Sequence, residues 1–422
     1  ADKGNAPLRV LERIADCYRL MDKYNEAEQW YGKVAGKSGA RPADNYYYAE
    51  ALLRNEKFAE AKLAYNMYFE KNGAKALRDL KLAACDSAAA WMKRDGNYRV
   101  KAVPGLNSPY SDWGAGYQSK TNMVFTSDRL TGSHDDKHID NRTGNEWFKP
   151  FAYDVSSGRI TEMALDNSGK INLSKNYHTG PVAFNAAGDT AYITISTRQK
   201  ISKLKNEKLT DGSVYTRRLE LITATQKNGR WGNFTRFQYD NVKNYSVGHA
   251  AITRDGQLLY FMSDMAGGFG KTDIWYCVRR YDGKWSEPIN CGKTINTADD
   301  EAFPAIGGDG RLYYSSKGLP GMGGFDVFSA KGSGTDWETP VNLKYPLNST
   351  SDDFSLATLD GISGYVSSNR QGGKGSDDIY SFIYAPQAAV PVVARVVKPA
   401  VSAPVKPATL HVPVAGAAIL EG

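Results

Sequence analysis

The sequence lacks the signatures by which many enzymes and metalloproteins are identified. It contains only five histidines and four cysteines in 422 residues. It has no Gly-x-Ser-x-Gly nucleophile elbow, no phosphate-binding glycine loop and no zinc-type cysteine spacing. We therefore expect no catalytic activity and no cofactor, while the sequence leaves open whether a metal is bound.

The chain also lacks an apolar run as long as a membrane span, so we expect none. Its 53 Lys and Arg residues stand among 46 Asp and Glu, which gives a formal charge of +7 without any basic stripe. This distribution argues against a nucleic-acid partner. Because the chain begins at Ala1 without a methionine or an apolar targeting segment, we expect the numbering to describe a processed or trimmed product.

The first 92 residues contain a helical pattern that repeats every 34 residues. The repeated pairs are Ala15 and Ala49, Ala27 and Ala61, and Tyr31 and Tyr65. This period resembles that of tetratricopeptide repeats, in which small residues let helices approach closely. A last helix over residues 76–92 places Ala83 at 34 residues beyond Ala49 and is interpreted as a cap. We predict a helical domain of two repeats and a cap over residues 1–97, small enough to lean on the next domain.

From about residue 98 the pattern changes to short strands separated by glycine turns. Three segments share a strand ending in Ser, a glycine pair, and an Asp that opens an apolar strand ten residues after the Ser. These residues are Ser263 and Asp273, Ser316 and Asp326, and Ser368 and Asp378. Weaker copies end at Ser127 and Ser196, so the five serines are 69, 67, 53 and 52 residues apart. Such repeats are typical of four-stranded propeller blades, and we predict a five-bladed β-propeller over residues 98–384.

Strand counting also predicts how the ring closes. The last copy ends at Tyr384 before a fourth strand appears, whereas residues 98–103 form a strand without a partner. We expect residues 98–103 to pair with residues 378–384. This pairing would complete the last blade and remove an exposed sheet edge.

The end of the chain has a different composition. Residues 385–408 are rich in Pro, Ala, Val and Lys and are predicted to form a semi-rigid linker. Residues 409–422 resemble the first strands of a carboxypeptidase-regulatory-like β-sandwich, so we expect the natural chain to continue.

Helical repeats, a propeller with Ser-Asp-Arg and Asp-Ile-Tyr motifs, a Pro-rich linker and the start of a regulatory-like module follow one another in this order. The arrangement resembles the OmpA-family envelope proteins of Bacteroidota that carry a TolB/WD40-like propeller, including one in the type IX secretion system. The resemblance implies a non-catalytic periplasmic scaffold that docks outer-membrane or secretion-system proteins at the outer membrane. In that family peptidoglycan is bound through a C-terminal domain that this sequence does not contain.

Three acidic residues stand at one level of the predicted propeller. Asp112, Glu301 and Asp353 each lie two residues before the predicted start of an innermost strand, where blades two and three carry Pro181 and Gly248. We expect these acids to lie near the axis and to be structural or cation-holding. The alternative is a carbohydrate-active propeller enzyme, in which one funnel carboxylate donates a proton while another attacks or activates water.

Two further groups could hold a metal. Asp273, Asp326 and Asp378 follow glycine turns, which suits either calcium or hydrogen bonds to the backbone of the same turn. His134 and His138 flank two aspartates and are interpreted either as metal ligands or as loop charges.

The four cysteines give a weaker signal. Cys277 and Cys291 lie on either side of a turn, and we predict that they are cross-strand neighbours, bridged or unbridged. Cys17 and Cys85 occupy equivalent positions two repeats apart and are predicted to stay separate.

Overall fold

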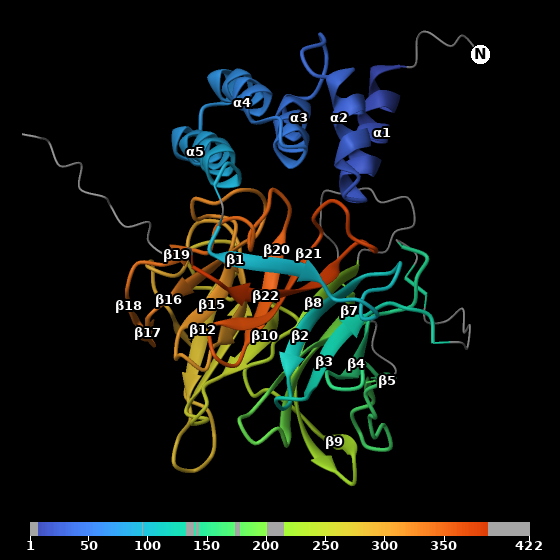
Figure 1. Ribbon diagram of the computed structural model, residues 1–422, viewed down its shortest axis with the longest axis vertical. Coiled ribbons are helices and arrows are strands. Elements are labelled where there is room, and N and C mark those ends of the chain that lie inside the picture. The colour runs from blue at the N-terminus through green and yellow to red at the C-terminus, as the bar shows by residue number, and fades with distance from the viewer. Residues whose placement is uncertain are drawn as a thin grey trace, which may run out of the picture. The chain divides into compact units, whose positions relative to one another are not determined.

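The computed structural model describes residues 7–94, 96–131, 139–140, 143–173, 178–200 and 215–386. It confirms the predicted fold class, because five helices in this range are followed by a five-bladed β-propeller (Figure 1). None of the described helices is long and apolar enough to cross a membrane. The predicted domain limits stay predictions. His134, His138 and residues 387–422 lie outside the described residues.

The helical region is built from neighbouring helices that pack in sequence order. They are α1 (Leu8–Leu20), α2 (Tyr24–Gly32), α3 (Pro42–Arg54), α4 (Phe58–Asn72) and α5 (Lys75–Met92). All six repeated Ala and Tyr positions predicted from the sequence are buried. The Tyr31 hydroxyl donates a hydrogen bond to Asp16 (2.8 Å), and the Tyr65 hydroxyl donates one to Glu50 (2.5 Å). The same buried bond therefore recurs with the 34-residue period of the sequence.

Helix α5 departs from the predicted register. Ala83 is exposed, whereas Ala84 and Cys85 are buried. The connection before the helix also differs: only Gly73 and Ala74, both with positive φ, link α4 to α5, whereas residues 33–41 link α2 to α3. The chain therefore enters α5 differently from α3, and a different face of the helix meets the core.

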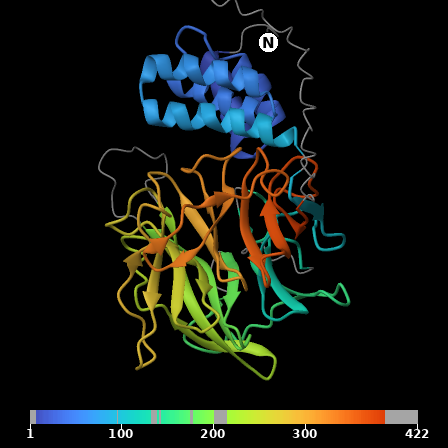
Figure 2. The ribbon, with the colours of Figure 1, turned by 60° about the vertical axis from the view of Figure 1, so that its left-hand side comes forward.

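The propeller consists of five four-stranded antiparallel sheets (Figure 2). Blades one and two contain β2 (Asp112–Tyr117), β3 (Asn122–Ser127), β4 (Lys149–Asp154), β5 (Ile160–Glu162), β6 (His178–Phe184), β7 (Thr190–Lys200), β8 (Tyr215–Lys227) and β9 (Arg230–Arg236). Blades three and four contain β10 (Val247–Ile252), β11 (Leu258–Ser263), β12 (Asp273–Val278), β13 (Ile289–Asn290), β14 (Glu301–Ile306), β15 (Leu312–Ser316), β16 (Asp326–Ala330) and β19 (Val341–Asn342). Blade five contains β20 (Asp353–Thr358), β21 (Ser363–Ser368), β22 (Asp378–Tyr384) and β1 (Tyr98–Ala102). A two-stranded hairpin, β17 (Gly332–Ser333) and β18 (Asp336–Trp337), extends blade four.

Each innermost strand carries a β-bulge at the same level, after its second paired residue. The first bulge residue has a φ between 50° and 121° in every blade; these residues are Gly114, Gly180, His249, Phe303 and Ser355. Three of them carry a Cβ, for which this conformation is unfavourable. Because the bulge recurs in all five blades, it belongs to the architecture of the inner strands.

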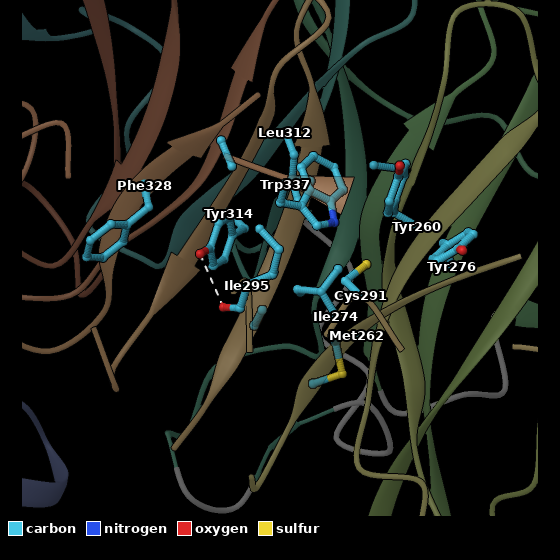
Figure 3. Close-up of a cluster of buried hydrophobic side chains, with 13 residues drawn as sticks. Tyr260, Met262, Ile274, Tyr276, Cys291, Ile295, Leu312, Tyr314, Phe328 and Trp337 are labelled. Atoms are coloured by element: carbon cyan, nitrogen blue, oxygen red, sulfur yellow. Dashed lines mark hydrogen bonds between the residues drawn. The ribbon is translucent and has the colours of Figure 1, made fainter. Parts of the chain in front are cut away.

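Apolar side chains fill the space between neighbouring blades. Figure 3 shows the core between blades three and four, where Tyr260 and Ile274 face Leu312 and Tyr314. The Tyr314 hydroxyl donates a hydrogen bond to the Ile295 carbonyl (3.2 Å), so this buried polar group is satisfied. Four similar clusters lie between the other neighbouring blades and complete the ring.

The first strand closes the ring, as predicted. β1 pairs antiparallel with β22, from Tyr98 opposite Tyr384 to Ala102 opposite Tyr380 (Figure 1). Tyr98 and Val100 also pack against the apolar core between blades four and five. The N-terminal strand thus supplies both backbone pairing and apolar contact to the last blade.

The end of α3 contacts blade five. The Arg54 guanidinium is 7% exposed and forms an ion pair with Asp352 (3.2 Å) just before β20. The Arg54 carbonyl, one of the groups left unpaired at a helix end, accepts a hydrogen bond from the Thr350 hydroxyl (3.1 Å). Gln371 donates another to Asn55 (3.1 Å). These contacts agree with the expectation that the small helical domain packs against the next domain.

The prediction that Cys277 and Cys291 are cross-strand neighbours is wrong. Cys277 packs in the core between blades two and three, whereas Cys291 packs in the core between blades three and four. They project to opposite faces of the blade because side chains alternate along a strand. All four cysteines are free, and burial raises the pKa of the Cys277 thiol to about 12.

Ring closure by β1 makes a testable prediction. Deleting residues 98–106 removes β1 and the buried Leu106, and should lower the unfolding temperature of the propeller by about 10 °C or more. Deleting residues 1–90 removes the helices and should cost the propeller much less. Thermal unfolding followed by tryptophan fluorescence measures both losses. Equal losses from the two deletions would show that β1 does not close the ring.

Candidate functional site

The three acids predicted from the sequence are each the first residue of an innermost strand. Asp112 begins β2, Glu301 begins β14 and Asp353 begins β20, and all three are fully buried. Each lies opposite the repeat serine of its blade, which is Ser127, Ser316 or Ser368. The acids therefore occupy equivalent positions, but each is the first residue of its strand rather than two residues before it, as the sequence had predicted.

Asp112 and Asp353 have the same partners. Asp112 pairs with Arg129 and Asp353 pairs with Arg370, both at 2.5 Å. Each carboxylate also accepts hydrogen bonds from the backbone N–H and the hydroxyl of the serine four residues before it, Ser108 or Ser349. A buried carboxylate is stable only when a cation and hydrogen-bond donors surround it. Both acids are therefore engaged within their own blade.

Glu301 is held without an arginine. Gly318 occupies the position of Arg129 and Arg370, and a Cβ there would stand 1.8 Å from the Thr297 hydroxyl oxygen. Glu301 instead accepts hydrogen bonds from the Ser316 hydroxyl (2.6 Å), the Thr297 hydroxyl (2.8 Å) and the Thr297 N–H (2.7 Å). Burial raises the pKa of Glu301 to about 7, although these bonds act in the opposite direction.

The residues assigned to this level in blades two and three were wrong. The strand register places His178 opposite Ser196 and Val247 opposite Ser263, rather than Pro181 and Gly248. In both blades the turn between the two innermost strands is one residue longer, and blade two has one more residue pair after the bulge, so counting back from the serine misses the strand start. His178 Nδ1 accepts a hydrogen bond from the Phe148 N–H (3.1 Å), and its Nε2 lies 2.9 Å from the Arg217 guanidinium.

The structure does not bring the three acids together. Within the described part of the chain, no group of three or more His, Cys, Asp or Glu side chains converges where a metal could bind. The three aspartates that follow glycine turns bond to the backbone of those turns, which was one of the two alternatives from the sequence. Asp273, Asp326 and Asp378 each accept two hydrogen bonds from backbone N–H groups of the preceding turn.

A separate feature, missed by the sequence reasoning, lies on the propeller axis. A cavity of about 370 Å³ is lined by the parts of the inner strands after their bulges and by the turns that follow. Its floor includes His249 and Phe303, whose rings stack at 4.1 Å. Lys120 and Arg254 lie among its lining residues. The three acids are not among its described lining residues, because they lie on the other side of the bulges.

Some of these residues left a signal in the sequence. Arg129 and Arg370 stand two residues after the repeat serine in the two blades whose inner strand begins with Asp. Arg198 stands at the same place in blade two, whose inner strand begins with His178, so the arginine alone does not identify the ion pairs. His249 gave no such signal, because a left-handed bulge interrupts the alternation by which a strand is recognised.

The raised pKa of Glu301 makes a testable prediction. Between pH 4.5 and 7 the unfolded chain releases this proton while the folded chain keeps it, so the free energy of unfolding should fall by about 3 kcal/mol as pH rises. Glu301→Gln resembles the protonated acid and should lack this part of the pH dependence. Urea unfolding of both proteins from pH 4 to 8 measures the difference. A difference between the two proteins that stays constant across this range would show that the pKa of Glu301 is the same in the folded and unfolded chains.

No protein-family model matches the chain, and no curated protein matches its sequence. Among solved structures, the chain is similar to a protein of unknown function from Dyadobacter fermentans, with 12% identity, a TM-score of 0.38, and coverage of 69% of this chain and 100% of that one. A β-1,2-mannobiose phosphorylase from Listeria innocua shows 9% identity, a TM-score of 0.40, and coverage of 68% and 96%. An α-L-arabinofuranosidase from Fusarium graminearum shows 11% identity, a TM-score of 0.39, and coverage of 68% and 98%. These similarities concern the propeller fold and assign neither a family nor an activity.

Proposed function

We propose that this protein is a non-catalytic periplasmic scaffold that docks protein partners at the outer membrane and anchors a secretion machine to the cell envelope. This role corresponds to that of PorE in the type IX secretion system, which the order of modules in the sequence resembles. The observation that carries the proposal is the buried polar contact between the helical region and blade five.

A scaffold that connects partners must keep its modules in a fixed relation. Arg54 and Asp352 are 298 residues apart in the chain and form a largely buried ion pair. Burial alone raises the pKa of Asp352, but the Arg54 and Lys317 cations more than offset this and hold it below its usual value. The Arg54 guanidinium also lies 5.0 Å from the centre of the Tyr24 ring. Specific contacts of this kind favour one orientation of helices and propeller.

The helices also expose apolar side chains that a protein partner could cover. Leu63 and Met67 lie one helical turn apart on α4 and are 66% and 55% exposed. Residues at this spacing share one face of a helix. A partner that buries both side chains would gain apolar contact without any change in the helical region.

The alternative function, a carbohydrate-active enzyme, requires carboxylates that reach a substrate. Asp112 and Asp353 are paired with arginines, and Glu301 accepts hydrogen bonds from Thr297 and Ser316 within its own blade. A glycosidase of the usual kind places two carboxyl groups on either side of the scissile bond. The geometry of the three acids therefore favours the scaffold over the enzyme.

The docking role can be tested in the producing bacterium. The tagged double variant Leu63→Glu, Met67→Glu should lose its outer-membrane partners in cross-linked purifications by about tenfold, because two charges would be buried in the interface. The matched control is Ile289→Glu, Val341→Glu, which changes two exposed apolar residues on outer propeller strands and should retain the partners. The proposal fails if the wild-type chain does not fractionate with the envelope. It also fails if wild type hydrolyses arylglycosides or cell-wall oligosaccharides and Glu301→Gln does not.

The contact between the modules makes a separate prediction. Arg54→Met leaves Asp352 without its cation and should lower the free energy of unfolding by about 3 kcal/mol. Arg78→Met is the matched control, because Arg78 is 37% exposed and pairs on the surface with Asp79, so its loss should cost less than about 0.5 kcal/mol. Urea unfolding measures both. Equal effects of the two substitutions would contradict a structural role for the Arg54 ion pair.

A further inference from the structure

The axial cavity has the size and composition of a small-molecule site. Its volume of about 370 Å³ falls within the range of ligand pockets. Small side chains from every inner strand line its walls, among them Ala115, Pro181, Ala250, Pro304 and Ala357. Such residues leave space along the axis, where the lining is about equally polar and apolar, and a bound molecule would be contacted by all five blades.

The floor of the cavity is aromatic and contains an unsatisfied nitrogen. The His249 ring stacks on Phe303 with an interplanar angle of 11°, and the rings of Phe354 and Trp113 also pack against Phe303. His249 Nδ1 is buried and has no hydrogen-bond partner among the described residues. Burial lowers the pKa of His249 to about 3, so the ring is neutral at physiological pH. Since Nδ1 is sealed, Nε2 is the ring nitrogen left to meet a ligand in the cavity.

The mouth of the cavity is positively charged. Lys120 and Arg254 are exposed there, and the described lining contains no Asp or Glu. Four acids belong to the inner-strand turns and are engaged by them. Asp189 accepts hydrogen bonds from the Asn185 amide and the Thr190 hydroxyl, and Asp255 accepts them from the Thr253 hydroxyl and the Gln257 N–H. Asp360 accepts hydrogen bonds from the Ile362 and Ser363 N–H groups, and Asp309 accepts one from the Tyr313 hydroxyl. The two cations are therefore available to an anion entering from solvent.

We propose that the axial cavity binds a small organic anion with a flat ring: Lys120 and Arg254 hold its carboxylate at the mouth, the ring lies against the aromatic floor, and a hydroxyl on the ring bonds to His249 Nε2. This site is independent of the docking role proposed above. The three chemical features of the ligand correspond to the charge at the mouth, the aromatic floor and the neutral imidazole.

The probe for this site is 6-hydroxy-2-naphthoate, with binding to the full chain measured by isothermal titration calorimetry. We expect Lys120→Glu, Arg254→Glu to weaken binding on the order of tenfold, because both cations are replaced by like charges. The corresponding neutral amide of the probe should bind the wild type about as weakly as the anion binds this variant. The control Lys284→Glu, Lys331→Glu makes the same charge change at exposed positions outside the cavity and should bind the anion as wild type does.

The role of His249 is tested with His249→Phe. Phe303 adopts the same left-handed conformation at the equivalent position of blade four, so the backbone accepts phenylalanine there. The substitution should weaken binding of 6-hydroxy-2-naphthoate about fivefold and leave binding of 2-naphthoate, which lacks the hydroxyl, nearly unchanged. The proposal is overturned if neither compound binds at millimolar concentration, if the mouth variant and its control bind equally, or if His249→Phe weakens both compounds to the same extent.

Discussion

The pairing of β1 with β22 is the interaction on which the rest of this structure depends. A ring of blades is complete only when its last sheet has four strands, and the fourth strand of blade five comes from the other end of the propeller sequence. Because β1 follows α5 after a short connection, the same pairing attaches the helical region beside blade five. There Arg54, at the end of α3, contacts Asp352 and Thr350. Closure of the ring and contact between the modules are therefore linked by chain connectivity.

The inner strands separate two chemical environments along the axis. Each strand begins at a level where Asp112, Glu301 and Asp353 are buried in three blades, and each passes through a bulge into the wall of the axial cavity. At the first level, two blades balance a buried carboxylate with arginine, whereas Glu301 is retained with a raised pKa. Beyond the bulges the walls combine small apolar side chains with polar groups, and the charged side chains lie at the mouth. The three buried acids thus lie apart from the surface that a ligand in the axial cavity could reach.

Local chemistry explains which features could be predicted from the sequence. The aspartates after glycine turns bond to those same turns, so their spacing identifies the blades, and the number of strands determines how the ring closes. Features that depend on distant or irregular geometry could not be predicted. A turn longer by one residue moved the strand start to Val247, and alternation along the blade separated Cys277 from Cys291. The contact of Arg54 with Asp352 joins segments that share no pattern.

Backbone hydrogen exchange tests the closure of the ring most directly, because it reports the opening of individual strands in the intact chain. If β1 completes blade five, the amides of β1 that bond to β22 should exchange as slowly as those of β21, through opening of the whole blade. Exchange of β1 that is faster than that of β21 by several orders of magnitude would contradict this account, since the ring would then stay folded while its last strand detached.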